Sequence, residues 1–272
     1  MTRNYYHLVA SLPDLLFKSD SFKNVSLLQI RNFIMEEVSA GDLAYMYEIL
    51  SHIDNYNLIT HLYGKNRAWK TGGKFDAESF SNPHDTNLPE YMRQFFDYIE
   101  KYKSENGTQP DCFLAEQYLY KLCYESLEAS KNMFVSKYSR LEKEIRNVQT
   151  AYLCRQSGIS FENQFIAEDE LTEMLAKSQA QDFGLSKEWD YLAGLVQIFD
   201  VKDLFEREMK LDMFRWNNID EINVFEYFTV NMVLGTLQKA CIAERWMAMD
   251  GSKGEKIFKK LINELKSWNL KS

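Results

Sequence analysis

The clearest hydrophobic pattern in the chain lies near its middle, between residues 139 and 158. Apolar side chains recur there at steps of four, three and four residues, at Leu141, Ile145, Val148 and Tyr152. This spacing predicts an α-helix that is buried along one face. Glu142 and Arg146 stand four residues apart on another face, in the favourable order for an ion pair, and we expect them to face water.

Part of this helical pattern recurs in the first and last thirds of the chain. In each copy an asparagine precedes an apolar residue, and a basic residue follows the asparagine by eight positions. The three pairs are Asn57 with Lys65, Asn147 with Arg155, and Asn231 with Lys239. Similar intervals of 90 and 84 residues between the asparagines favour three repeated modules. Chance is the alternative explanation, because all three residue types are common in this chain.

Helical patterns are also predicted on both sides of the central helix. In the first half we expect helices over 26–42, 43–65, 89–103 and a region from 111 into the central helix with one interruption near Ala129. Ser26 is a predicted cap, and Gly41 with Asp42 a predicted turn. The second half is expected to contain an acid-started helix over 168–184, one capped by Ser186, one over 201–216, the most hydrophobic one over 224–250, and a last one over 255–269.

Two segments are less regular. The aromatic N-terminal stretch before Pro13 fits a helical face and an alternating strand equally well, so both assignments stay open. Residues 71–89 contain glycines, serines, asparagines and two prolines, which predicts a loop long enough to be mobile or to reach a partner. Gly72, Gly73 and Lys74 in this loop lack the other residues of a phosphate-binding loop.

Composition supports an all-α fold and narrows the classes of partner. The 272 residues include only 4 prolines and 11 glycines, which are few turn signals for a chain rich in helix-forming residues. A net charge of -8 argues against a nucleic-acid partner, because phosphate binding requires clustered Lys and Arg. Protein partners are therefore expected.

The cysteines and the terminal sequence indicate a compartment. Four widely spaced cysteines form no C-x-x-C pair, and the N-terminal sequence does not resemble a secretory signal, so we expect reduced thiols in the cytoplasm. The longest uncharged apolar stretch, residues 227–238, is shorter than the ~20 residues of a membrane span. Any work at a membrane is therefore expected to be peripheral.

No catalytic, cofactor-binding or metal-binding motif is present. The chain contains no nucleophile elbow, no H-E-x-x-H and no glycine-rich dinucleotide turn. His52 and His61 are nine residues apart, which is not the spacing of two metal ligands on one helix face. The acidic run at residues 168–170 has a structural explanation at a helix start. We therefore expect no catalytic residue, cofactor or metal, although a site built from scattered residues stays possible.

Four stretches of the chain resemble a known family. They are "YYHLVASLPDLLF" near the start, "HIDNYNLITHLYG", "LEKEIRNVQTAYLCRQSG", and "LQKACIAERWMAMDGSKGEKIFKKLINELK" at the end. Together they look like a bacterial family of uncharacterised proteins encoded among the components of V-type ATPases. That family is similar to the C-type connector of V-type and archaeal A-type ATPases, which is also called the d-type connector. The six residues of the asparagine–basic pairs match the repeated helix of that connector.

The resemblance implies an architecture and a role. The implied fold is three similar helical modules around a pseudo-threefold axis, here residues 1–105, 106–185 and 186–272, in one compact unit. The implied role is a non-catalytic connector that docks the central shaft onto the membrane rotor ring and transmits torque, in the cytoplasm at the inner membrane. A free-standing helical adaptor is the alternative, and an enzyme with a pocket near Glu48, His52 and His61 is a third hypothesis.

The chain also departs from the pattern of the C-type connector. It is shorter than a typical member, and the acidic residue expected just before the asparagine is not in place in every copy. It is present as Asp54 and Glu144 in the first two copies but displaced to Glu226 in the third. This displacement predicts that the third module departs most from the connector's arrangement.

Overall fold

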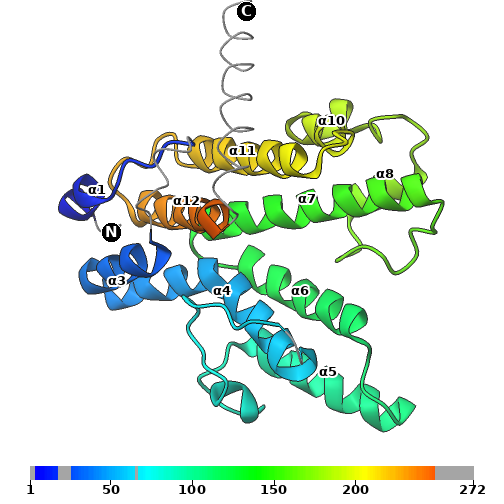
Figure 1. The fold of residues 1–272 in the computed structure, drawn as a ribbon, viewed down its shortest axis with the longest axis horizontal. Helices are drawn as coiled ribbons and strands as arrows, with labels where there is room; N and C mark the ends of the chain where they lie inside the picture. Colours follow the sequence, from blue (N-terminus) through cyan, green and yellow to red (C-terminus); the bar gives the residue numbers. More distant parts are fainter. Residues whose placement is uncertain (1–3, 18–25, 65–66, 249–272) are drawn as a thin grey trace, which may run out of the picture. The chain divides into compact units, whose positions relative to one another are not determined.

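A computed structural model describes residues 4–17, 26–64 and 67–248, and we refer to it as the structure (Figure 1). The fold is all-α: these residues form helices joined by turns and loops, with no β-strand among them. The predicted helix over 255–269 lies outside the described residues. The described chain divides into two compact units, which we treat separately.

Unit 1 holds the described residues up to Ile49 and those from Asp203 onward. Its helices are α1 (Tyr6–Ser11), α3 (Leu27–Glu37), the start of α4 (Ala40–Tyr63), α11 (Leu204–Ile222) and α12 (Val230–Ala248). Both α1 and α3 pack against α12. The N-terminal segment is therefore helical, and it joins the C-terminal helices in one core. The backbone N–H of Leu27 donates to Oε1 of Glu244 at 3.3 Å, and that of Tyr5 to the carbonyl of Phe228 at 2.6 Å.

Unit 2 holds residues 50–202 and is built around α7 (Met133–Ser157). Its other elements are the rest of α4, η1 (Ser79–Ser81), α5 (Glu90–Asn106), α6 (Cys112–Glu128), α8 (Glu170–Lys177), α9 (Leu185–Glu188), η2 (Asp190–Leu192) and α10 (Gly194–Phe199). In Figure 1 α7 is the long green helix, and α6, α8 and α10 all pack against it. Leu141, Ile145 and Val148 are buried, which confirms the predicted apolar face.

The units do not follow the predicted module boundaries. Their limits fall after Ile49 and after Lys202, whereas the modules were expected to meet after residues 105 and 185. The physical reason is that α3, from the first third, buries its Leu27, Ile30 and Ile34 in the same unit as α12 from the last third. The threefold arrangement of modules stays a prediction.

Helix caps account for most of the boundaries. Ser26 caps α3 as predicted, with its side-chain oxygen accepting from the N–H of Gln29 at 3.3 Å. The predicted turn at Gly41 and Asp42 is wrong, because α4 begins at Ala40. Ser39 caps it by accepting from the N–H of Asp42 at 3.3 Å, and Tyr5 donates its hydroxyl to the Asp42 carboxylate.

The second half contains two further corrections. Ser186 does not begin a long helix: it lies inside the four-residue α9, which follows Gly184 in the left-handed conformation, and it donates its hydroxyl to Asp182 at 2.5 Å. The stretch after it is broken into η2 and α10. The acidic run at residues 168–170 does start a helix, because Asp169 caps α8 in a reciprocal pair with Thr172.

The predicted loop at residues 71–89 is packed onto unit 2. It contains η1, whose Phe80 is buried and lies against the rings of His61, Trp69 and Phe75 at centroid distances of 6.2, 5.9 and 6.1 Å. Burying one large aromatic side chain removes ~150–250 Å² of surface from water, which is enough to fasten a short segment. The loop is therefore anchored by its own side chains.

Candidate functional site

The first predicted pair centres on Asn57, which is fully buried on α4. Its side-chain amide donates to the carbonyl of Lys70 at 2.9 Å, and its side-chain oxygen accepts from the N–H of Lys70 at 2.9 Å. One turn earlier, Oδ1 of Asp54 accepts from the N–H groups of Lys74 and Phe75 at 2.8 and 3.1 Å. These two side chains bind the backbone of the segment that follows their own helix.

The glycines of that segment have a structural purpose. A Cβ atom added to Gly73 would lie only 2.3 Å from Oδ1 of Asp54, so a side chain there would push the segment away from the carboxylate. Gly72 has a φ of 96°, a conformation that favours glycine. The Gly72–Lys74 stretch therefore lets backbone N–H groups reach a buried carboxylate of the chain itself.

The second pair repeats this arrangement on α7. Asn147 is fully buried, and its side-chain oxygen accepts from the N–H of Ile166 at 3.0 Å. One turn earlier, the buried Glu144 accepts from the hydroxyl of Tyr191 at 2.9 Å. Burial raises the pKa of Glu144 to about 7. In the first two copies, therefore, an acid and an amide one turn apart fasten segments that lie further along the chain.

The third copy differs, as the displacement of its acidic residue indicated. Asn231 is buried on α12, and its backbone carbonyl accepts from the side-chain amide of Asn223 at 3.1 Å, which lies earlier in the chain. The position one turn before Asn231 is occupied by Phe228, which is 40% exposed. Glu226 instead accepts from the Thr229 hydroxyl at 2.6 Å.

The basic residues of the pairs also act locally. Arg155 donates to the carbonyls of Ser178 and Ala180 at 3.0 and 2.7 Å, and its guanidinium lies 3.3 Å from the ring centroid of Phe183. Lys239 pairs with Asp220 and lies 4.9 Å from the Trp216 ring centroid. Lys65 lies outside the described residues.

The predicted residues therefore do not converge on one reactive centre. Each of Asn57, Asn147 and Arg155 holds a different stretch of unit 2, and Asn231 and Lys239 belong to unit 1. A buried amide whose partner is left unpaired costs ~1–3 kcal/mol. These contacts consequently stabilise the fold and stiffen the connections between helices.

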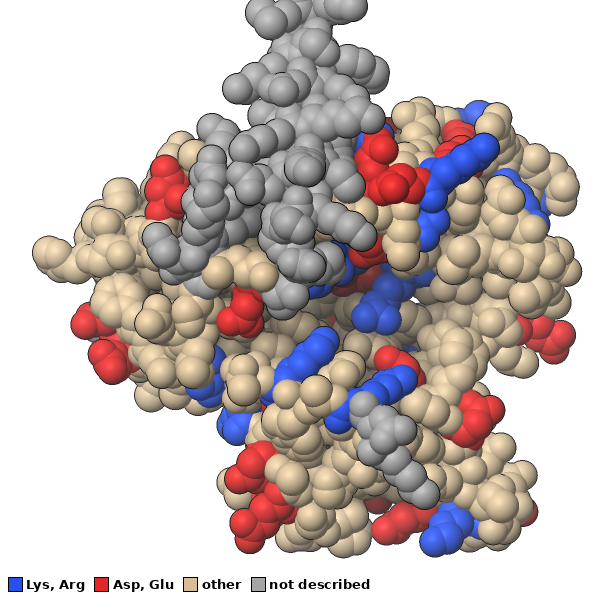
Figure 2. Space-filling view, in the orientation of Figure 1, with Lys and Arg blue, Asp and Glu red and all other residues tan. Residues whose placement is uncertain are grey.

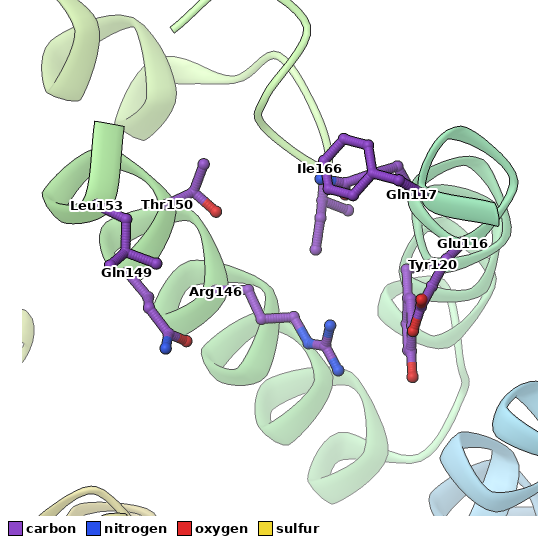
Figure 3. Close-up of a pocket in the computed structure, with 9 residues that line it drawn as sticks. Glu116, Gln117, Tyr120, Arg146, Gln149, Thr150, Leu153 and Ile166 are labelled. Carbon is purple, nitrogen blue, oxygen red and sulfur yellow. The ribbon is translucent and has the colours of Figure 1, made fainter. Parts of the chain in front are cut away.

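A hollow of about 230 Å³ between α6 and α7 is the most distinctive polar feature of unit 2. It is lined by Phe113, Glu116, Gln117, Tyr120, Arg146, Gln149, Thr150, Leu153 and Ile166, and we call it the Arg146 hollow. Figure 3 shows Arg146 extending from α7 toward Tyr120 on α6. Its guanidinium carbon lies 4.1 Å from the centroid of the Tyr120 ring.

The expectation that Arg146 faces water with Glu142 is wrong. Arg146 is mostly covered, because α6 packs against this side of α7 and places the Tyr120 ring over the guanidinium. The carboxylate of Glu142 accepts from the Tyr138 hydroxyl at 2.8 Å. Burial acts to lower the pKa of Arg146, but the neighbouring Tyr124 and Tyr120, together with Glu142, raise that pKa, so its charge is fixed at every physiological pH.

A second hollow lies beside Arg155. It measures about 360 Å³ and is lined by residues of α7, the 179–183 segment and α10, among them Tyr152 and Asp200, whose side chains hydrogen-bond at 2.8 Å. Neither hollow is lined by His52 or His61. Across the described part of the chain, no group of three His, Cys, Asp or Glu side chains is placed to hold a metal ion.

Unit 1 has an exposed aromatic surface at the turn between α11 and α12. Val224, Phe225, Tyr227 and Phe228 are 53%, 81%, 62% and 40% exposed, and Tyr6 of α1 lies against Phe228 with ring centroids 4.6 Å apart. We call these five residues the aromatic turn. Contiguous exposed apolar residues of this kind mark interaction surfaces.

The charged surface gives no competing indication. On the face shown in Figure 2, acidic and basic side chains are interspersed, and most of the area is neither. In the described ranges, no helix is both long and apolar enough to cross a bilayer. The thiols of all four cysteines are free of disulfides.

Sequence reasoning missed both the Arg146 hollow and the aromatic turn. The first depends on which helix packs beside α7, which no local pattern states. The second had a signal in the sequence, because V-F-E-Y-F places four apolar residues within five, but the stretch was assigned to the start of a buried helix. In the structure that helix begins at Val230, so the aromatic residues fall in the turn.

Comparison with known proteins gives a family and nothing closer. Neither the curated proteins nor the solved structures contain a significant match to this chain. A family described as "Protein of unknown function (DUF2764)" matches residues 1–268, almost the whole sequence. The chain therefore belongs to the DUF2764 family.

Proposed function

We propose that this protein is a non-catalytic connector of a V-type ATPase, similar in role to the C-type connector, which docks the central shaft onto the membrane rotor ring. The sequence resemblance described above motivates this proposal. A connector that transmits torque needs helices that do not shift against one another, and packed helical interiors have this rigidity. The buried amide and carboxylate contacts of Asn57 and Asn147 supply it in unit 2.

The observation that carries the proposal is the aromatic turn. Phe225 is 81% exposed and Tyr227 62%, although each would be stabilised by ~1.5–3 kcal/mol if its side chain were buried. Aromatic residues are enriched at protein interfaces. A protein partner that covers this turn explains their exposure, and in this proposal the partner is a V-type ATPase component of the shaft or the ring. The protein would then be cytoplasmic and peripheral to the inner membrane.

Copurification tests the proposal. The tagged protein is isolated from cells that express the complete V-type ATPase, and the recovered proteins are identified. We expect the wild-type chain to recover shaft or ring components, and the double variant Phe225→Ser with Tyr227→Ser to lose them. The matched control is Leu204→Ser, because Leu204 is 61% exposed in the same unit but is not part of the aromatic turn. Recovery of the wild-type protein as a free monomer would contradict the proposal.

A free-standing helical adaptor is the second candidate function. It would use the same exposed aromatic turn for a partner outside the ATPase. The two functions predict different neighbours: a connector gene is expected among V-type ATPase genes, and the copurified partners should be ATPase components. An adaptor should instead recover unrelated proteins, with the same loss in the Phe225→Ser and Tyr227→Ser variant.

A further inference from the structure

Arg146 carries a permanent charge in a place where the protein does not neutralise it. Within the described ranges, no carboxylate lies at ion-pair distance from its guanidinium, whereas Arg215 and Arg245 both pair with Asp212. Removing a charge from water is unfavourable unless an opposite charge or hydrogen bonds replace the lost hydration. The Tyr120 ring, 4.1 Å from the guanidinium carbon, covers one side of the group and leaves its N–H edge without a carboxylate.

The walls of the Arg146 hollow combine polar and apolar groups. Gln149 and Thr150 follow Arg146 along α7 and present an amide and a hydroxyl to the hollow. Phe113 and Leu153 also line it and are 57% and 50% exposed. Ligand sites are typically apolar with a few convergent polar groups. At about 230 Å³, this one is below the ~300–1,000 Å³ of drug-sized pockets, so it suits a small group.

The second charged residue of the hollow restricts the charge of a ligand. Glu116 lines the same hollow from α6, so its carboxylate and the Arg146 guanidinium nearly cancel. A singly charged group can bind the guanidinium edge while its apolar part faces away from Glu116. A dianion such as phosphate would bring a second negative charge close to Glu116, which is unfavourable. Arginine also binds carboxylates through two parallel hydrogen bonds.

We propose that the Arg146 hollow binds a single carboxylate group backed by an apolar group. Arg146 donates to the carboxylate, Gln149 and Thr150 supply further hydrogen bonds, and Phe113 and Leu153 cover the apolar part. The carboxylate belongs either to a small organic acid or to a glutamate side chain of a protein. This site is independent of the connector proposal, because the hollow lies in unit 2 and the aromatic turn in unit 1.

Side-chain NMR of the full chain tests the site directly. With ¹⁵N-labelled arginine, the Nε–H signal of Arg146 is followed during titration with phenylacetate, with the blocked peptide acetyl-Leu-Glu-Leu-amide, with neutral phenylacetamide and with inorganic phosphate. We expect a saturable shift with phenylacetate or with the peptide, and none with phenylacetamide. Tighter binding of phenylacetate indicates a small acid, and tighter binding of the peptide indicates a protein side chain.

Three variants establish which residues are responsible. Arg146→Gln should weaken binding of the carboxylate probe by about tenfold or more, because the charged donors are lost. The control is Arg140→Gln on the same helix, since Arg140 is exposed, lies outside the hollow and bridges to Glu128 at 3.8 Å. Glu116→Gln should tighten carboxylate binding by a few fold and allow phosphate to bind, and it keeps the test decisive if the Arg146 variant does not fold.

Two results would overturn the inference. The first is the lack of a saturable shift of Arg146 with either carboxylate probe in the wild-type chain. The second is phosphate binding more tightly than both probes, since that would assign the hollow to a different class of anion. Equal carboxylate binding in wild-type protein and in the folded Glu116→Gln variant would contradict the role given to Glu116.

Discussion

The contacts of Asn57 allow a quantitative prediction for the substitution Asn57→Ala. The side chain is fully buried and makes two hydrogen bonds of 2.9 Å to the backbone of Lys70. Each such bond contributes ~1 kcal/mol net. Lys70 itself is exposed, so water can reach its released N–H and carbonyl, and no further penalty for orphaned groups is expected. The free energy of unfolding should therefore fall by about 2 kcal/mol.

A second substitution at this position separates the two bonds. Asn57→Asp keeps the acceptor for the Lys70 N–H but replaces the donor with a carboxylate oxygen that faces the Lys70 carbonyl. At neutral pH we expect a loss of about 3 kcal/mol, because a buried charge is added to the lost bond. Burial raises the folded-state pKa of the new carboxyl, so this loss should shrink as the pH falls and the protonated group donates to the carbonyl.

Urea unfolding and amide hydrogen exchange provide the measurements. The exposed Asn217 of α11 supplies the control, since Asn217→Ala removes an asparagine from a helix surface and should change stability by less than ~0.5 kcal/mol. The Lys70 amide should exchange faster in Asn57→Ala only. The reasoning is refuted if Asn57→Ala and Asn217→Ala unfold at the same urea concentration and Lys70 exchange is unchanged.

Three further predictions concern other buried contacts. The pKa of Glu144, about 7, lies above the ordinary carboxyl value of 4.5, so stability should fall by roughly 2–3 kcal/mol as the pH rises from 4.5 through 7; Glu144→Gln should remove this dependence in urea titrations across that range. Arg155→Ala loses the bonds to Ser178 and Ala180, so limited proteolysis should cut residues 178–183 faster, with a cost of about 1–2 kcal/mol; unchanged cleavage would count against it. Asp212 accepts from Arg215, Arg245 and Trp246 while only 2% exposed, so Asp212→Asn should lower the thermal stability of unit 1 by about 3 kcal/mol, and a melting temperature equal to that of the wild type would contradict this.

Local sequence patterns predicted the helices well where a cap or a period specified them. The apolar face of α7, the cap at Ser26 and the start of α5 at Pro89 all follow from side chains within one or two turns. The predicted boundaries failed where a distant residue intervened. Ser39 begins α4 with help from Tyr5, which is 34 positions away in the sequence, and no local signal contains that contact.

The candidate sites divide in the same way. The asparagine pattern identified Asn57 and Asn147, since both lie on the buried side of amphipathic helices that a period reveals. It did not show what they bind, because Lys70 and Ile166 reach them through turns of different lengths. Arg146 was expected in water, because a charged residue outside the apolar stripe looks exposed until the neighbouring helix is known.

The sequence by itself determined that this chain is helical, where most helices lie and which faces they bury, because helix formation depends on side chains a few positions apart. Only the tertiary structure decided which helices become neighbours. That choice grouped the first and last segments into unit 1, placed Tyr120 over Arg146 and left Phe225 in an exposed turn. These features depend on contacts between residues far apart in the chain, where apolar burial selects the partner and a local pattern carries no record of it.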